Sequence, residues 1–425
     1  MTQVRIRPGP VRGVVRAPPS KSYTHRALVT AHLAGRRFAV VRPLWSNDTL
    51  RTVGAIRALG SQVTLGRDRW IVTPSRRGSQ RGRSRIDCGE SGTTLRFASA
   101  LAALHYRPVE LVGRGRLPLR PMGALTTALR TLGASVEEPA PPRSLPMVVR
   151  GPIRGGSVVV DASESSQFVS ALLLALPTVS EASVLRLSGP PVSEPYIEAT
   201  VAVLRSSRIR VTKGRQRFRI PGRQSYRGTS FRVPGDASSA AYLWAAAAVA
   251  GGAVTVLGLP DPWPQADLAV LQLLRRFGAR VVSRPRGTTV AFRERRPFRV
   301  ELTDSPDLYP LAGVLAATAR GVSTLAGAAH VAAKESDRRV ETIRLATGMG
   351  ATVRATADAL RIEGRDDPRP LAVRDATDHR IVMSAAIGAL AASGPSWVGR
   401  ADAVNKSFPG FWAVLSQISG RGRIA

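Results

Sequence analysis

The sequence predicts an α/β protein of six repeats that fall into two domains of three. The hydrophobic fraction of 44% is typical of a folded chain, and a length of 425 residues suggests about two or three domains. A segment with apolar residues at helical spacing, ending in a small residue and followed by a β-type run, recurs along the chain. The small residues lie 73, 74, 71, 72 and 70 positions apart, at Gly60, Gly133, Ser207, Gly278, Gly350 and Gly420. This regular spacing predicts one structural unit of about 70 residues that is repeated six times.

Each repeat is expected to contain two helices. The second helix is the segment that ends in the small residue, and these segments begin at Thr52, Ala124, Tyr196, Asp267, Glu341 and Phe411. A first helix precedes each of them, and the first-helix segments begin at Thr24, Thr94, Gln167, Ser238, Tyr309 and His379. Most first helices lead into a short β-rich run such as VELVGRG or SVLRLSG. One unit is therefore predicted as helix, strand, helix and strand.

Six units are too many for one hydrophobic core, so two groups of three are expected. We place the break after the third unit, because residues 205–232 contain ten basic residues, no acidic residue and the turn-rich stretch PGRQSYRG. The uncharged window 240–260 is long enough to span a bilayer. Because Gly251 and Gly252 divide this window, we expect a buried helix followed by a buried strand instead.

The charge balance is strongly basic, with 62 Lys and Arg residues against 29 Asp and Glu residues and a formal net charge of +33. Only four of the basic residues are lysines, and a nucleotide bias in the coding sequence is the simplest explanation. In such a chain a remaining lysine can mark a place that needs a compact ammonium group. The single cysteine, Cys88, excludes a disulfide framework and a cysteine-based zinc site. The first residues lack the apolar core of a signal peptide, so we expect a cytoplasmic protein.

Polar motifs stand at the start of the first helix of each repeat. They are PSKSYTHR, GESGTTLR, SESSQF, PGDASSA, TDSPDLYP and ATDHR. Capping explains their Ser, Thr and Asp residues, which accept hydrogen bonds from the first N–H groups of a helix. Capping does not explain the accompanying cations, because positive charge is unfavourable at this end of a helix dipole. These cations are Lys21, Arg26, Arg96 and Arg380. Several such helix starts together predict a site for a ligand rich in phosphate and carboxylate groups.

The motif KESDR, residues 334–338, suggests acid–base chemistry. On a helix, Lys334 and Arg338 would be like-charged neighbours one turn apart, which destabilises a helix by about 0.2–0.5 kcal/mol. Glu335 is within reach of Arg338, so a solvated charged face is one interpretation. The functional interpretation is a proton-transfer carboxylate, held between cations that also bind an anion. LPLRPMG and NKSFPGF are two further motifs with a cation beside a proline turn.

Taken in order, the motifs from PSKSYTHR to NKSFPGF make the chain similar to the 5-enolpyruvylshikimate-3-phosphate synthases, also called 3-phosphoshikimate 1-carboxyvinyltransferases. The resemblance covers nearly the whole chain. It implies the two-domain enolpyruvyl-transferase fold of six βαβαββ repeats, three per domain, with the active site in the interdomain cleft. Residues 20–233 are then expected to form one domain, mainly for shikimate 3-phosphate. Residues 1–19 and 234–425 are expected to form the other, mainly for phosphoenolpyruvate and the acid–base groups.

The resemblance also implies the reaction. The enolpyruvyl group of phosphoenolpyruvate is added to the 5-hydroxyl of shikimate 3-phosphate, and phosphate is then eliminated. This step of the shikimate pathway to chorismate and the aromatic amino acids uses no metal and no organic cofactor, and it is the family's glyphosate target. The expected partners are therefore the two small-molecule substrates, with no membrane and no specific nucleic acid, and the chain is expected to be a monomer.

Site residues are carried over motif by motif from the family. Those expected to bind shikimate 3-phosphate are Lys21, Ser22, Arg26, Ser165, Ser166, Gln167, Ser193, Tyr196, Asp307, His330 and Lys334. Those expected to bind phosphoenolpyruvate are Lys21, Gly92, Arg120, Gln167, Arg338, Arg380 and Lys406. In the implied mechanism Asp307 is the base at the 5-hydroxyl, and Lys334 assists it. Glu335 transfers the proton at the methylene carbon, and Lys21 is a catalytic cation shared by both substrates.

Three residues depart from the family's usual pattern. Glu90 and His330 stand where Asn is common, and Ala332 stands where Arg is common. These departures alter the charge and hydrogen bonding expected near the anionic substrates, and they leave the resemblance intact.

Two other functions fit parts of the sequence. A carboxyvinyltransferase that acts on UDP-N-acetylglucosamine shares the fold, but its members usually carry a reactive Cys or Asp in a mobile loop. Here Cys88 directly precedes GESGT, where we expect a buried strand end. The net charge also suggests an RNA-binding or RNA-end-processing protein. However, no basic stretch with interleaved aromatic residues provides a stacking platform for bases.

Overall fold

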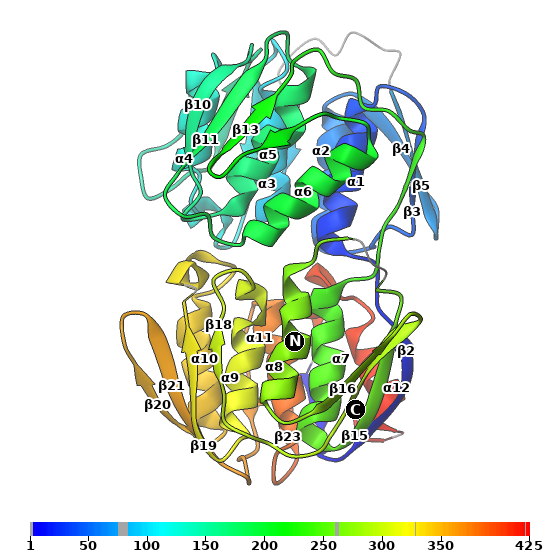
Figure 1. Cartoon of the computed structure of the whole chain (residues 1–425), viewed down its shortest axis with the longest axis vertical. Coiled ribbons are helices and arrows are strands. Elements are labelled where there is room, and N and C mark those ends of the chain that lie inside the picture. Colours follow the sequence, from blue (N-terminus) through cyan, green and yellow to red (C-terminus); the bar gives the residue numbers. More distant parts are fainter. Residues whose placement is uncertain (1–2, 75–83, 260–262, 328, 421) are drawn as a thin grey trace. The chain divides into compact units, whose positions relative to one another are not determined.

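The computed structural model describes residues 3–74, 84–259, 263–327, 329–420 and 422–425. Contacts between residues divide the chain into two units (Figure 1). One unit is Pro19–Pro234, and the other joins Met1–Pro18 to Gly235–Ala425. The domain boundaries expected from the resemblance were 20 and 233.

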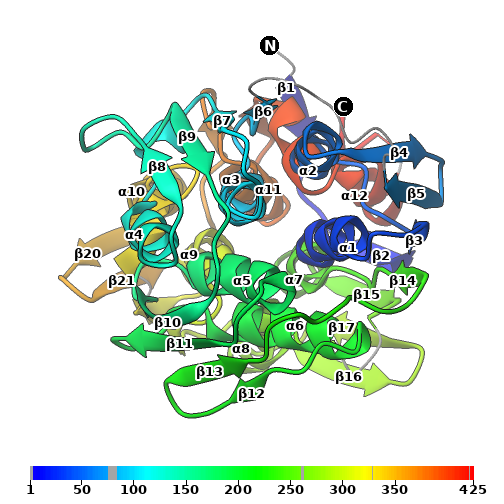
Figure 2. The same cartoon turned by 90° about the horizontal axis from the view of Figure 1, so that it is seen from above.

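The described residues of the unit 19–234 form three sheets and their helices. Its helices are α1 (Lys21–Leu33), α2 (Asn47–Ala58), α3 (Gly92–Ala102), α4 (Gly123–Thr131), α5 (Ser166–Ala175) and α6 (Glu194–Ser206), with the 3-10 helices η1 (Leu117–Leu119) and η2 (Leu176–Thr178). Its strands are β3 (Phe38–Val41), β4 (Ser61–Leu65), β5 (Arg69–Pro74), β6 (Ser84–Asp87), β7 (Val109–Val112), β8 (Ser135–Glu137), β9 (Met147–Arg150), β10 (Gly156–Asp161), β11 (Ser183–Ser188), β12 (Thr212–Lys213), β13 (Arg217–Ile220) and β14 (Ser230–Arg232). The strand orders are β14-β3-β5-β4, β6-β7-β9-β8 and β10-β11-β13-β12. In Figure 2, α1, α3 and α5 lie inside this ring of sheets.

The second unit repeats this plan. Its helices are α7 (Ala237–Ala250), α8 (Val270–Arg276), α9 (Tyr309–Ala317), α10 (Arg338–Gly348), α11 (His379–Ala389) and α12 (Phe411–Ser419), with η3 (Ala266–Ala269), η4 (Pro306–Leu308), η5 (Ala329–Ala333) and η6 (Ala401–Lys406). Its strands are β1 (Gln3–Ile6), β2 (Val11–Arg16), β15 (Gly252–Leu257), β16 (Arg280–Arg284), β17 (Gly287–Ala291), β18 (Arg299–Glu301), β19 (Gly321–Ala326), β20 (Thr352–Ala355), β21 (Ala359–Gly364), β22 (Ala372–Val373) and β23 (Ser396–Gly399). The strand orders are β16-β17-β15-β2, β18-β19-β21-β20 and β1-β23-β22.

The four-stranded sheets share one pairing pattern. In the sheet of β10 to β13, for example, β10 and β11 are parallel, β11 and β13 are antiparallel, and β13 forms a hairpin with β12. A parallel pair needs a helical connection, and α5 with η2 supplies it here. The structure confirms the predicted α/β class with three repeats in each unit. It corrects the unit of helix, strand, helix and strand that the periodicity alone predicted. It agrees with the βαβαββ order that the resemblance implied, since β10, α5, β11, α6, β12 and β13 follow one another in that order.

In each unit, strands that are distant in sequence pair to complete a sheet. The N-terminal strand β2 runs parallel to β15, and β1 pairs with β23, so the first strands belong to the unit built from the C-terminal half. Conversely, β14 returns to pair with β3, the first sheet of its own unit. Each unit therefore completes its first sheet with a strand that is distant in sequence.

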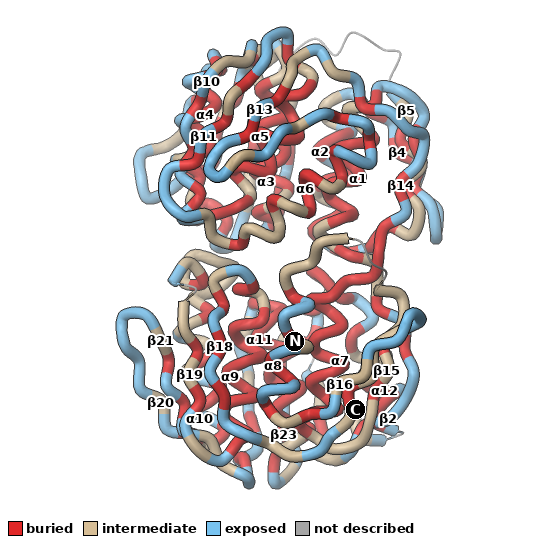
Figure 3. The backbone as a smooth tube through the Cα atoms, in the orientation of Figure 1, coloured by how far each residue is buried: buried red, intermediate tan, exposed pale blue. Residues whose placement is uncertain are grey.

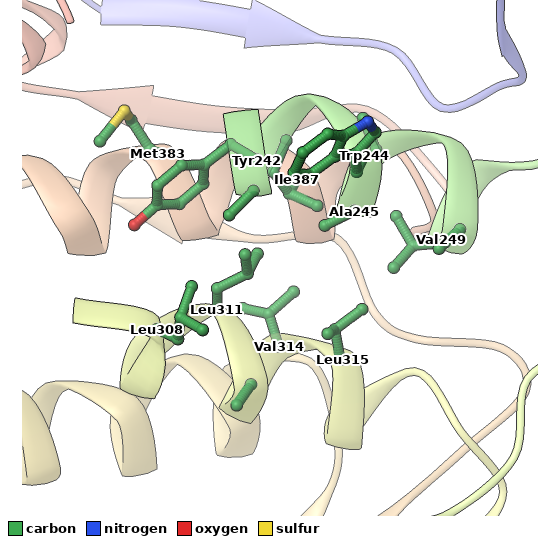
Figure 4. Packing of buried hydrophobic residues seen from close by; sticks show 14 of the residues in the cluster. Tyr242, Trp244, Ala245, Val249, Leu308, Leu311, Val314, Leu315, Met383 and Ile387 are labelled. Carbon is green, nitrogen blue, oxygen red and sulfur yellow. The ribbon is translucent and has the colours of Figure 1, made fainter. Parts of the chain in front are cut away.

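Helix α7 forms the centre of the core in the second unit. Its residues are almost all buried (Figure 3), and it packs with α9 and α11. Figure 4 shows Tyr242 and Trp244 of α7 near Leu311 and Val314 of α9 and Ile387 of α11. The predicted buried helix and strand in the uncharged window are confirmed as α7 and β15. Among the described residues, no helix is long and apolar enough to cross a membrane.

Candidate functional site

Helices α1, α2 and α3 bring Lys21 to a shared polar corner. Lys21 is the first residue of α1, and its Nζ lies 3.2 Å from Oδ2 of Asp48 in α2. The hydroxyl of Ser46 caps α2 by accepting from the N–H of Thr49, which places Asp48 in the first helical turn. The main-chain carbonyl of Asp48 accepts a hydrogen bond from Thr94 of α3 at 3.3 Å. The ammonium group is therefore held where the starts of α2 and α3 meet.

Arg26 is a buried cation held by neutral groups. It is 2% exposed, and its Nε donates to Oγ1 of Thr200 at 2.8 Å. Its Nη1 and Nη2 donate to the carbonyls of Ser22 and Tyr196 at 2.9 and 2.8 Å. Burial lowers the pKa of Arg26 to about 10, so the group stays charged at neutral pH. No acidic side chain pairs with Arg26 among the described residues, and a buried cation without a counter-ion is suited to bind an anion.

Gly92 begins α3 against two arginines. A Cβ atom added at Gly92 would lie 2.6 Å from Nη1 of Arg120 and 2.7 Å from Nη1 of Arg96. Arg96 in turn donates to Oε1 of Gln167 at 2.8 Å and to the carbonyl of Pro121 at 3.0 Å. A residue without a side chain therefore leaves the N–H groups at the start of α3 next to both guanidinium groups, which is a favourable arrangement for an anion.

The starts of α5 and α6 supply hydroxyl and amide groups. Ser165 caps α5 by accepting from the N–H of Gln167 at 3.3 Å, and Ser166 is the buried first residue of that helix. Gln167 also donates to Oγ1 of Thr93 at 3.2 Å, which ties α5 to α3. Ser193, at the start of α6, is 4% exposed, and its hydroxyl has no hydrogen-bond partner within the described part of the chain. A buried hydroxyl of this kind is available to a ligand.

In the second unit, Arg338 gathers three carboxylates. This side chain is 1% exposed, and its Nη1 donates to Oδ1 of Asp307 at 2.6 Å. Its Nη2 donates to Oε2 of Glu335, and its Nε donates to Oδ2 of Asp378, both at 2.9 Å. Burial alone would lower the pKa of Arg338, but the charges of Asp378, Asp307 and Glu335 raise it above its ordinary value. The permanently charged guanidinium thus fixes both carboxylates that were expected to transfer protons.

Arg380, the second residue of α11, shares Asp307 with Arg338. Its Nη2 donates to Oδ2 of Asp307 at 2.9 Å and to Oγ of Ser238 at 3.0 Å. The side chain is 3% exposed, and its Nε and Nη1 make no hydrogen bond to the residues that the structure describes. Burial by itself lowers the pKa of Arg380, but Asp307 together with Tyr242, Asp267 and Asp236 raises it above its ordinary value. Asp378 caps α11 and accepts from the N–H of Arg380 at 2.8 Å, which links the two arginines.

His330 and Lys334 lie beside this cluster. Burial and the nearby Lys334 lower the pKa of His330 to about 3, while Asp307 acts in the opposite direction. The imidazole is therefore neutral at physiological pH and can accept as well as donate a hydrogen bond. Lys406 is buried at the end of η6, and η6 packs on α11, the helix of Arg380.

The KESDR motif does not lie on a helix as one of our interpretations required. Lys334 and Glu335 form the turn between η5 and α10, and α10 begins at Arg338. The side chain of Asp337 caps α10 by accepting from the N–H groups of Arg339 and Val340, both at 3.1 Å. Because this helix begins at Arg338, Lys334 lies outside it, and the two residues are not neighbours one helical turn apart.

Several polar residues of these clusters were not among the expected site residues. Asp48 and Thr200 hold Lys21 and Arg26, and Asp378 and Ser238 hold Arg338 and Arg380. Asp378 and Ser238 lie within the motifs ATDHR and PGDASSA, so the sequence did place them at helix starts beside the expected site residues. In the described ranges, no group of three or more His, Cys, Asp or Glu side chains is arranged to hold a metal ion.

Each unit therefore has cations, serines and helix N-termini gathered at the starts of its first helices. In an α/β protein, such a geometry is suited to small molecules that carry several negative charges.

Comparisons with known proteins identify the family. The family model described as EPSP synthase (3-phosphoshikimate 1-carboxyvinyltransferase) matches residues 6–415. The chain is 40% identical over 416 residues to 3-phosphoshikimate 1-carboxyvinyltransferase of Methanoculleus marisnigri, covering 96% of this chain and 97% of that protein. It is also 40% identical over 410 residues to the enzyme of that name from Thermococcus kodakarensis, covering 96% of this chain and 98% of that protein. The chain belongs to the EPSP synthase family.

A solved structure supports the fold. The EPSP synthase of Acinetobacter baumannii superposes with a TM-score of 0.82, covering 100% of this chain and 99% of that one at 24% sequence identity. The fold implied by the motifs is therefore confirmed.

Proposed function

We propose that this protein transfers the enolpyruvyl group of phosphoenolpyruvate to the 5-hydroxyl of shikimate 3-phosphate, releasing phosphate. The observation that carries the proposal is membership of the EPSP synthase family over residues 6–415. The geometry of both units supports it, because the substrates carry two phosphates and two carboxylates between them. The buried cations at the helix starts provide matching positive groups.

We assign shikimate 3-phosphate mainly to the unit 19–234. Arg26 and Lys21 supply the charges, while Ser165, Ser166 and Ser193 supply hydroxyls and helix N-termini. Residues of this kind suit a phosphate, which accepts several hydrogen bonds at once. Ser22, Gln167 and Tyr196 complete the group of proposed ligands from this unit.

We assign phosphoenolpyruvate mainly to arginines. Arg338 and Arg380 are the proposed carboxylate ligands, since a guanidinium group presents paired donors to a carboxylate. Arg120 beside Gly92, together with Lys21, Gln167 and Lys406, completes this proposed set. Inhibition by glyphosate that phosphoenolpyruvate relieves is the expected pharmacological consequence.

The proposed chemistry has two steps. In the addition, the 5-hydroxyl oxygen bonds to C2 of phosphoenolpyruvate, the hydroxyl proton passes to Asp307, and Glu335 delivers a proton to C3. In the elimination, C3 returns a proton to Glu335, the bond from C2 to the phosphate oxygen breaks, and phosphate leaves with the proton that Asp307 took from the hydroxyl. Asp307 and Glu335 suit these roles because Arg338 holds both carboxylates in place at 2.6 and 2.9 Å. Lys334 and neutral His330 are the proposed neighbours of the reacting hydroxyl.

The acceptor is tested by offering two alternatives. Phosphate release from phosphoenolpyruvate is measured with shikimate 3-phosphate, with UDP-N-acetylglucosamine and with no acceptor. If phosphate is released from phosphoenolpyruvate with shikimate 3-phosphate and not under the other two conditions, the proposal is supported. If it is released only with UDP-N-acetylglucosamine, the proposal is refuted. We further propose that the chain acts as a monomer in the cytoplasm, since one chain contains all the proposed ligands and its first residues lack the apolar core of a signal peptide.

A further inference from the structure

Arg380 is oriented by residues that come from two other elements. Ser238, in the first turn of α7, accepts a hydrogen bond from Nη2 of Arg380 at 3.0 Å. The hydroxyl of Ser238 is in turn hydrogen-bonded to Oδ2 of Asp267 in η3. Because a carboxylate only accepts, the hydroxyl proton points to Asp267 and the oxygen lone pairs face Arg380.

The carboxylate behind Ser238 is buried and firmly placed. Asp267 and Ser238 are 2% and 7% exposed. Gln265, just before η3, accepts from the N–H of Ala237 at 2.9 Å and donates to the carbonyl of Gly235 at 2.8 Å. These two bonds join the segment that carries Asp267 to the beginning of α7. The carboxylate and the hydroxyl therefore keep a fixed separation.

The arrangement leaves the rest of Arg380 for another acceptor. Nη2 is occupied by Ser238 and Asp307, whereas Nε and Nη1 have no hydrogen-bond partner in the described ranges. On one side the guanidinium carbon lies 5.9 Å from the centre of the Tyr242 ring. A guanidinium held at one nitrogen and packed on a ring has little freedom to rotate, so its remaining donors keep one direction.

We propose that Ser238 and Asp267 are positioning residues for Arg380: they set the direction in which its free donors meet the carboxylate of phosphoenolpyruvate. This inference rests on the proposed function, because it concerns how one of the proposed substrate ligands is aimed. Neither residue contacts the reacting atoms in this scheme. Their effect is therefore on phosphoenolpyruvate binding and not on the acceptor.

Steady-state kinetics of three single variants test the proposal. Ser238→Ala removes the hydroxyl and should raise the KM for phosphoenolpyruvate about tenfold, which corresponds to about 1.4 kcal/mol. The KM for shikimate 3-phosphate should stay at the parent value. Ser238→Thr keeps a hydroxyl and should recover most of the loss. Asp267→Asn keeps an acceptor oxygen without its charge, so its KM for phosphoenolpyruvate should lie between those of the parent and Ser238→Ala.

Ser384→Ala is the matched control. Ser384 lies one turn after Arg380 in α11, is 0% exposed, and its hydroxyl has no hydrogen-bond partner among the described residues. Its removal should leave both KM values unchanged. If Ser238→Ala has the parent KM for phosphoenolpyruvate, or if both KM values rise alike, the positioning role is overturned. If Ser238→Ala does not fold, Asp267→Asn decides by the same criterion. If the parent protein itself releases no phosphate from phosphoenolpyruvate in the presence of shikimate 3-phosphate, the proposed function is refuted instead.

Discussion

At the scale of single residues, Asp307 is bonded to two arginines at once, to Arg338 at 2.6 Å and to Arg380 at 2.9 Å. We predict that Asp307→Asn lowers kcat by about 10²–10⁴-fold, since a neutral amide cannot take the hydroxyl proton. Binding of phosphoenolpyruvate should be preserved or become tighter, because both arginines lose an internal counter-ion. Rapid-quench kinetics and calorimetric titration measure the two effects separately.

Asp337→Asn is the control for this change. It removes the same charge from the motif KESDR. Among the described residues, its Oδ1 accepts hydrogen bonds from the main-chain N–H groups of Arg339 and Val340 alone. It should keep the parent kcat. A parent-like kcat for Asp307→Asn would remove Asp307 from the mechanism. Weaker binding of phosphoenolpyruvate to this variant would contradict the idea that Asp307 competes with the substrate for the two arginines.

Glu335 should fail in a different way. Glu335→Gln keeps the shape and can still accept from Nη2 of Arg338, which lies 2.9 Å from the carboxylate in the parent. It cannot deliver a proton to the methylene carbon of phosphoenolpyruvate. We predict that exchange of solvent deuterium into that methylene group, followed by NMR, falls together with turnover. Normal exchange in a variant with poor turnover would assign the proton transfer to another residue.

How far single residues can be predicted from sequence depends on how they are held. Lys21, Arg26 and Arg380 stood out because a cation at a helix start conflicts with the helix dipole. Ser238 did not stand out as a partner of Arg380, because 142 positions separate them and only the packing of α7 against α11 brings them together. Local conflict is visible in a sequence, whereas a contact between distant helices is not.

At the scale of elements, the starts of the helices were the most predictable feature. Ser91, Ser165, Asp236 and Asp378 all cap the first helices of their repeats with side-chain oxygens, as the motifs indicated. The first strand of most hairpins was predicted as the run after the small residue, as in β4 and β16, whereas the short second strand, such as β13, was not recognised from the pattern. Such strands gain their stability from neighbours in the sheet, so their own sequence carries a weak signal.

Helix α1 contains a pH-sensitive element. His25 is 0% exposed and its Nδ1 lies 2.7 Å from Oγ1 of Thr52. Burial, followed by the charges of Lys21 and Arg26, lowers the pKa of His25 well below its ordinary value. Below pH of about 6.5 the unfolded chain therefore takes up a proton that the folded chain does not. The free energy of unfolding should fall with decreasing pH, by up to about 1.4 kcal/mol per pH unit for this residue.

His25→Asn checks this effect. Urea unfolding at pH 7 and pH 5 should show a smaller difference in the free energy of unfolding for the variant, by about 2 kcal/mol. The variant is expected to be less stable at both pH values, because it loses buried volume. An equal difference in variant and parent would show that His25 titrates normally in the folded protein.

At the scale of the whole molecule, the excess of arginine lies largely on solvated surface. The ten basic residues of 205–232 are all exposed. Such charge attracts anionic substrates without choosing among them, and salt screens it over about 8–10 Å. We predict that kcat/KM for either substrate falls as ionic strength rises, while the ratio between the two stays level. Stopped-flow or steady-state rates across a salt series measure this, and salt-independent rates would show that the net charge has no steering role.

The central claim is that the chain joins phosphoenolpyruvate to shikimate 3-phosphate and releases one phosphate. A time course by ³¹P NMR tests it most directly, because the two substrate phosphates and inorganic phosphate give separate resonances. With both substrates present, the phosphoenolpyruvate signal should be replaced by an equal amount of inorganic phosphate, while the shikimate phosphate stays covalently bound in the product. Phosphate release from phosphoenolpyruvate without shikimate 3-phosphate, or loss of the shikimate phosphate itself, would contradict the account.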